Sequence, residues 1–108
     1  MKYRIELAAT AKADIRGQAQ WLREQVSVAA ADKWLAGLYK AIDTLQTRPL
    51  RCPVAAESDS FPEEIRELLY GRQKRHKHRI IFTLREGIVY VLYVRHTARI
   101  SDSDLTPD

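Results

Sequence analysis

Residues 64–100 read EIRELLYGRQKRHKHRIIFTLREGIVYVLYVRHTARI, and the alternation within this stretch decides the fold. Residues 79–84 and 88–94 are rich in β-branched and aromatic side chains that alternate between two faces, which is typical of strands. Arg85-Glu86-Gly87 joins the two runs, and a short link that contains glycine predicts a β-hairpin. Both faces of this hairpin are largely apolar. We therefore expect it at the centre of a sheet, with helices on one side.

The chain length predicts one small domain over residues 1–108. The hydrophobic share of 45% is ordinary for a soluble globular chain, and no run approaches the ~18 apolar residues of a membrane helix. The N-terminus leads directly into an alternating strand at residues 2–7, which is unlike a secretory signal. We therefore expect a cytoplasmic protein with no membrane partner. Cys52 is the single cysteine, so no internal disulfide is possible, and we expect a half-buried loop thiol.

Two helices are predicted between the first strand and the hairpin. Apolar residues recur at helical spacing from Ala11 to Gln25, with Thr10 as a plausible N-cap. Ser27 is suited to cap a second apolar-striped helix that ends before Pro49. Only a couple of residues separate the helices, which predicts an antiparallel helical hairpin. Residues 49–62 contain three prolines and are expected to form an extended surface loop, either a functional segment or a plain connection.

The predicted order is therefore β-α-α-β-β-β, with the segment around residues 64–70 supplying a further strand. This is an α+β fold in which a two-helix antiparallel hairpin packs on a small, mostly antiparallel four-stranded sheet.

The charge distribution permits an anionic partner, either nucleic acid or an acidic protein segment, but does not require one. The net charge is +4, and residues 72–79, RQKRHKHR, contain five Lys or Arg and two His without any acid. Candidate anion- or target-binding residues lie on the strand at 64–70, in the turn that follows it and at the end of the last strand: Arg66, Lys74, Arg75, Lys77 and Arg95. We expect no metal and no cofactor, because no set of ligands has the spacing of a metal site and no phosphate-binding glycine pattern is present.

An Arg/His cluster without a metal is sufficient to bind RNA phosphate and to assist attack by a 2′-hydroxyl. Arg79, His96 and Arg99 are the candidate catalytic residues for such a reaction. Two alternatives stay open. The turn at 74–77 is either an anion site or a solvated, like-charged turn. Arg79, inside an apolar alternation, is either paired with an acid such as Glu67 or directed at a ligand.

The chain resembles the RelE/ParE superfamily of bacterial toxins, which are the toxin halves of type II toxin–antitoxin modules and include plasmid-stabilisation proteins. The resemblance rests on MKYRIELAATAKADI, ADKWLAGLYKAIDTL, the KHRIIFTL strand and VLYVRHTAR, found in this order over nearly the whole chain. It implies the fold derived above and neutralisation by a small cognate antitoxin. RelE-like members cleave mRNA on the ribosome without a metal, whereas ParE-like members poison DNA gyrase.

The resemblance assigns Arg79 to the phosphate-binding strand arginine of RelE-like toxins and places His96 one position from an acid–base histidine. No tyrosine follows Tyr93, and no lysine pair lies on residues 64–70. The long helices and the VLYVRHTAR ending favour the ParE-like branch, which implies a gyrase inhibitor. The alternatives are a RelE-like mRNA interferase acting on the ribosome and mRNA, and a non-toxic homologue that forms a complex with the antitoxin and represses its own operon.

Overall fold

The computed structural model describes residues 2–71 and 78–96 and contains two helices, four strands and three short 3-10 turns. The strands are β1 (Arg4–Leu7), β2 (Ile65–Tyr70), β3 (His78–Arg85) and β4 (Ile88–His96). The helices are α1 (Ala9–Gln25) and α2 (Val28–Asp43), and the 3-10 turns are η1 (Thr44–Gln46), η2 (Pro49–Arg51) and η3 (Ala56–Ser60). The predicted order β-α-α-β-β-β is confirmed. No helix in the described part of the chain has the length and apolar character needed to cross a membrane.

The sheet has the order β1-β4-β3-β2, so the predicted hairpin occupies its centre. β1 runs parallel to β4, while β2 and β4 both run antiparallel to β3. The sheet is therefore mixed, with two of its three pairings antiparallel. The link between β3 and β4 is a two-residue turn at Glu86 and Gly87, which both have positive φ, shorter than the three-residue link predicted from sequence.

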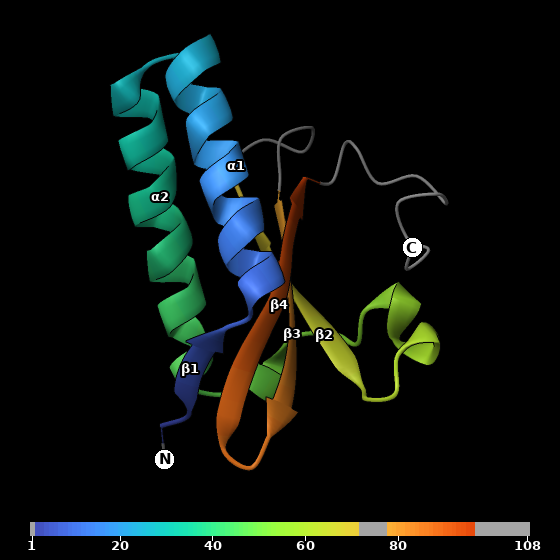
Figure 1. Cartoon of the computed structure of the whole chain (residues 1–108). Helices are drawn as coiled ribbons and strands as arrows, with labels where there is room; N and C mark the ends of the chain where they lie inside the picture. Colours follow the sequence, from blue (N-terminus) through green and yellow to red (C-terminus); the bar gives the residue numbers. More distant parts are fainter. Residues whose placement is uncertain (1, 72–77, 97–108) are drawn as a thin grey trace.

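The helical hairpin lies on one side of the sheet, and the segment that contains η3 lies on the other (Figure 1). The main core lies between helices and sheet and is built around Leu38, Leu45, Phe82 and Val91, all fully buried. A second, smaller cluster covers the opposite face, where Ala55, Ile65 and Ile81 pack with half-buried aromatic residues. Both faces of β3 are therefore buried, as its apolar composition predicts.

A β-bulge in β4 overturns the strict alternation expected for this strand. Ile81 pairs with Tyr93 but Phe82 pairs with Val91, so Leu92 is an additional residue. The extra residue moves the remainder of the strand to the other face. Val94 consequently joins Val89 and Val91 in the main core, whereas alternation alone places it with Ile88 and Tyr90.

Of the two N-caps predicted for the helices, one is confirmed and the other is wrong. Ser27 caps α2 by accepting a hydrogen bond from the Ala30 N–H at 3.0 Å, as expected. The predicted Thr10 cap is wrong, because α1 begins at Ala9 and its N-cap residue is Ala8. Thr10 instead donates its hydroxyl to the Leu92 carbonyl of β4.

The segment 49–62 is more ordered than the extended surface loop predicted for it. It contains η2 and η3, and Val54 forms an isolated antiparallel bridge with Arg66. Cys52 and Ala55 are buried, so Cys52 is not the half-buried thiol expected, and burial raises the pKa of its thiol. The segment therefore acts as a cover on the second face of the sheet.

Candidate functional site

Arg79 is enclosed by two carboxylates on the sheet face opposite the helices. Its Nη1 donates to Glu57 of η3 at 2.9 Å, its Nη2 donates to the other oxygen of Glu57, and its Nε donates to Glu67 of β2 at 2.7 Å. The side chains of Arg79 and Glu57 are each only 11% exposed. Of the two alternatives for Arg79, pairing with an acid such as Glu67 is confirmed, and Glu57 is a second partner that the sequence did not suggest.

The electrostatics of this trio oppose anion binding. The hydrogen bonds from Arg79 hold the pKa of Glu57 below its usual range, and the two carboxylates raise the pKa of Arg79. The trio contains two carboxylates and one guanidinium, which gives a formal net charge of −1. A phosphate would have to displace Glu57 from a bidentate pair and would meet the charge of Glu67. Arg79 thus ties η3 and β2 to the middle strand.

Arg66 is also occupied within the protein. One of its terminal nitrogens donates to the carbonyls of Cys52, at 2.6 Å, and Leu50, at 3.3 Å, and the other binds Glu64 at 2.7 Å. These contacts fasten the start of the 49–62 segment to β2. Its predicted role in target binding stays a prediction, and its observed contacts are structural.

Arg95 keeps an accessible guanidinium. It is the direct cross-strand partner of Arg79, yet its Nε binds Asp14 of α1 at 3.3 Å and its guanidinium stacks on Tyr93 at 5.0 Å. Its side chain is 51% exposed. Among the predicted cations in the described part of the chain, Arg95 is the one that still presents donors to solvent at the sheet end.

His96 lies on the other face of the sheet from Arg79. It pairs across the strands with His78, and the two rings meet edge to face with centroids 4.8 Å apart. His78 is 5% exposed and makes a second edge-to-face contact with Trp34 of α2 at 5.1 Å. Because neighbouring residues in a strand point to opposite faces, the sheet separates these imidazoles from Arg79. Arg79 and His96 therefore do not converge on one reacting atom.

The remaining predicted cations cannot be placed. Lys74, Arg75, Lys77 and Arg99 lie outside the described residues. The described residues contain no group of three or more His, Cys, Asp or Glu side chains that could hold a metal ion.

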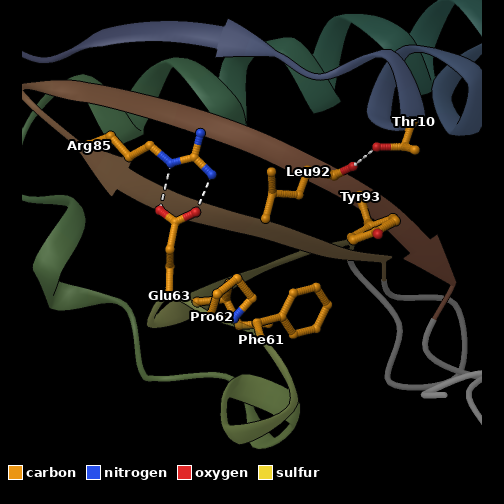
Figure 2. A pocket seen from close by; sticks show the side chains of 8 residues that line it. Thr10, Phe61, Pro62, Glu63, Arg85, Leu92 and Tyr93 are labelled. Carbon is orange, nitrogen blue, oxygen red and sulfur yellow. Dashed lines mark hydrogen bonds and ion pairs between the residues drawn. The ribbon is translucent and has the colours of Figure 1, made fainter. Parts of the chain in front are cut away.

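A small open pocket lies on the outer face of the sheet, beside β4 (Figure 2). It has a volume of about 200 Å³ and is lined by aromatic and aliphatic groups that include Phe61, Pro62, Leu92 and Tyr93. Arg85 and Glu63 form an ion pair at its rim, with the Arg85 Nε at 2.6 Å from Glu63. This pairing lowers the pKa of Glu63 and raises that of Arg85. The pocket can hold one apolar side chain and offers no unpaired charge for acid–base chemistry.

Sequence reasoning missed Glu57, Asp14 and His78 as partners of the predicted residues. Glu57 and Asp14 lie 22 and 81 positions from the arginines that they bind, so periodicity carries no signal of the contact. The pairing of His78 with His96 follows from the register of β3 and β4, which the bulge at Leu92 shifts.

A helical hairpin on one face of a four-stranded mixed sheet, with arginines at the strand ends, is the class of α+β domain that the sequence resemblance implied. Residues 5–101 match the family model described as the ParE toxin of the type II toxin–antitoxin system parDE. The chain therefore belongs to the ParE toxin family and is a ParE-type toxin of a type II toxin–antitoxin system.

A solved structure supports the same fold. A chain from a structure titled "Chromosomal ParDE TA system from P. aeruginosa" superposes with a TM-score of 0.70 at 15% sequence identity. The match covers 88% of this chain and 96% of that one. At this identity the likeness concerns the fold alone. The comparison with curated proteins finds no match.

Proposed function

We propose that this protein inhibits DNA gyrase in the cytoplasm and is held silent by a cognate antitoxin. The observation that carries the proposal is the enclosure of Arg79 by Glu57 and Glu67, together with its separation from His96 by the sheet. RNA cleavage without a metal needs a phosphate-binding cation and an acid–base group on the same reacting atom. Membership in the ParE toxin family supports the same conclusion.

Inhibition by binding needs no catalytic groups in the inhibitor. It needs an exposed surface that the target enzyme can contact, and this chain offers one. Arg95 is exposed beside Asp14 and Tyr93, and the basic turn 72–77 follows β2 in the sequence. A net charge of +4 favours encounter with an acidic surface or with a protein–DNA complex. The antitoxin we expect is acidic or amphipathic and lies across the helical hairpin and the sheet.

The test is a supercoiling assay with purified gyrase and relaxed plasmid, with the toxin added from nanomolar to micromolar concentration. We expect supercoiling to be blocked, and we expect an equimolar amount of the antitoxin encoded beside the toxin gene to restore it. Undiminished supercoiling at micromolar toxin would contradict the proposal.

Two further assays separate the rival functions. Programmed ribosomes incubated with the toxin test the mRNA interferase alternative, and we expect the A-site codon to stay intact. Induction of the toxin without antitoxin in bacteria tests the non-toxic alternative, for which growth would continue unchanged. We expect growth to stop.

A further inference from the structure

The last part of β4, where its pairing with β1 has ended, is closed by side chains from the start of α1. Thr10 donates its hydroxyl to the Leu92 carbonyl, and Asp14 accepts from the Val94 N–H at 3.0 Å. The same Asp14 oxygen lies 3.3 Å from the Nε of Arg95. The backbone from Leu92 to Arg95 is therefore held in place, and the side chains that it presents on the outer face have defined positions.

The pocket on the outer face and the guanidinium of Arg95 share one aromatic ring. Tyr93 lines the pocket and meets Phe61 edge to face, with ring centroids 6.4 Å apart (Figure 2). The Arg95 guanidinium lies over the Tyr93 ring, 5.0 Å from its centroid. Asp14 faces only the Nε, so the two terminal nitrogens of Arg95 have no hydrogen-bond or ion-pair partner within residues 2–71 and 78–96. An apolar cavity and a cation with available donors therefore lie next to each other.

The charged groups around the pocket determine the chemistry of its occupant. At the rim, Arg85 and Glu63 bind each other, so neither offers a charge to a ligand. Beside Tyr93, the terminal nitrogens of Arg95 favour a carboxylate, which a guanidinium binds through two parallel hydrogen bonds. The cavity of about 200 Å³ has room for one aliphatic or aromatic side chain. The surface therefore fits a protein segment that carries an apolar side chain next to an aspartate or glutamate.

We propose that gyrase binds this surface, with an apolar side chain of the enzyme in the pocket and a neighbouring carboxylate of the enzyme on Arg95. The inference rests on the proposed function, because it takes gyrase as the target. The Asp14 carboxylate beside Arg95 disfavours a nucleic-acid backbone, whose negative charges repeat along the strand, whereas a single carboxylate needs only the two terminal nitrogens. Tyrosine and arginine are also the residue types that often dominate the binding energy of a protein interface.

The test is the supercoiling assay with single variants of the full chain. Arg95→Gln keeps most of the aliphatic stem and removes the charge, while Tyr93→Leu keeps an apolar side chain in the strand and removes the ring. We expect each to raise the toxin concentration for half-maximal inhibition at least about tenfold. Arg23→Gln is the matched control, because Arg23 is exposed in the last turn of α1, at the other end of that helix from Thr10, and we expect wild-type inhibition. Circular dichroism melting checks the fold of each variant.

The outcomes separate the two claims. Wild-type toxin that leaves supercoiling intact would contradict the proposed function. Wild-type inhibition that a folded Arg95→Gln or Tyr93→Leu variant retains in full would overturn the proposed surface and leave the proposed function standing. Reduced antitoxin affinity in both variants, with gyrase inhibition unchanged, would assign the surface to the antitoxin and would also overturn the inference. If Tyr93→Leu does not fold, Arg95→Gln decides alone, because the Arg95 side chain is 51% exposed.

Discussion

Glu57, on a 3-10 turn, chelates Arg79, on the middle strand, through both terminal nitrogens of the guanidinium. Through this contact, Glu57 joins the segment 49–62, which covers the outer face of the sheet, to β3. The pair is nearly buried, so removing one partner destabilises the fold more than breaking a surface ion pair does.

Removing the Glu57 carboxylate should therefore destabilise the fold. We expect Glu57→Gln to lower the free energy of unfolding by about 2 kcal/mol, since it leaves Arg79 with only Glu67 as a charged partner. Asp59→Asn is the matched control, because Asp59 is exposed in the same turn, and we expect a change within about 0.5 kcal/mol. Urea denaturation at pH 7 measures both. Equal effects of the two substitutions would show that the ion pair adds nothing.

The same pair predicts a dependence of stability on pH. The folded-state pKa of Glu57 lies below the unfolded value of about 4.3, so its contribution is fully present above that pH. As the pH falls through the folded pKa, Glu57 is protonated in both states and the contribution disappears. We expect the stability difference between the wild type and Glu57→Gln to be constant from about pH 6 to 8 and to shrink below about pH 4.5. A difference that stays constant down to pH 3 would contradict this assignment.

Two glycines in the helices should respond to alanine in opposite directions. A Cβ at Gly37 would overlap the Tyr70 hydroxyl and lie 2.9 Å from its ring, so Gly37→Ala must displace Tyr70 from α2. We expect a loss of at least about 2 kcal/mol. Gly17, in α1, has nothing within 4 Å of such a Cβ, and Gly17→Ala should gain about 0.5–1 kcal/mol through helix propensity. Thermal unfolding checks both, and a stable Gly37→Ala would contradict the packing of Tyr70 on α2.

Closure of the β4 edge by α1 is open to a direct test. Asp14→Ala removes the acceptor of the Val94 N–H and the ion pair with Arg95, and we expect a loss of about 1–2 kcal/mol. Asp14→Asn retains an acceptor for Val94 and should lose less. Amide exchange at Val94 should accelerate in the alanine variant and stay slow in the asparagine variant. Equal exchange in both variants would show that Asp14 does not protect this edge.

The order of elements was predictable because it depends on local signals. Alternation marks the strands, Ser27 caps the second helix, which ends at Asp43 before Pro49, and Gly87 marks the hairpin turn. The details that decide the site depend on contacts between distant segments. The bulge at Leu92 determines that Arg95 shares a face with Arg79 and His96 with His78, and no alternation pattern signals it. Glu57 belongs to a segment that has the sequence of a plain loop. Its pairing with Arg79 could therefore be identified only from the structure.

The most direct test of the central claim is the supercoiling activity of purified gyrase as the toxin concentration rises, with mRNA on programmed ribosomes followed in parallel. We predict that supercoiling is lost at or below micromolar toxin while the A-site codon remains uncut. Full supercoiling together with cleavage of the A-site codon would contradict the account.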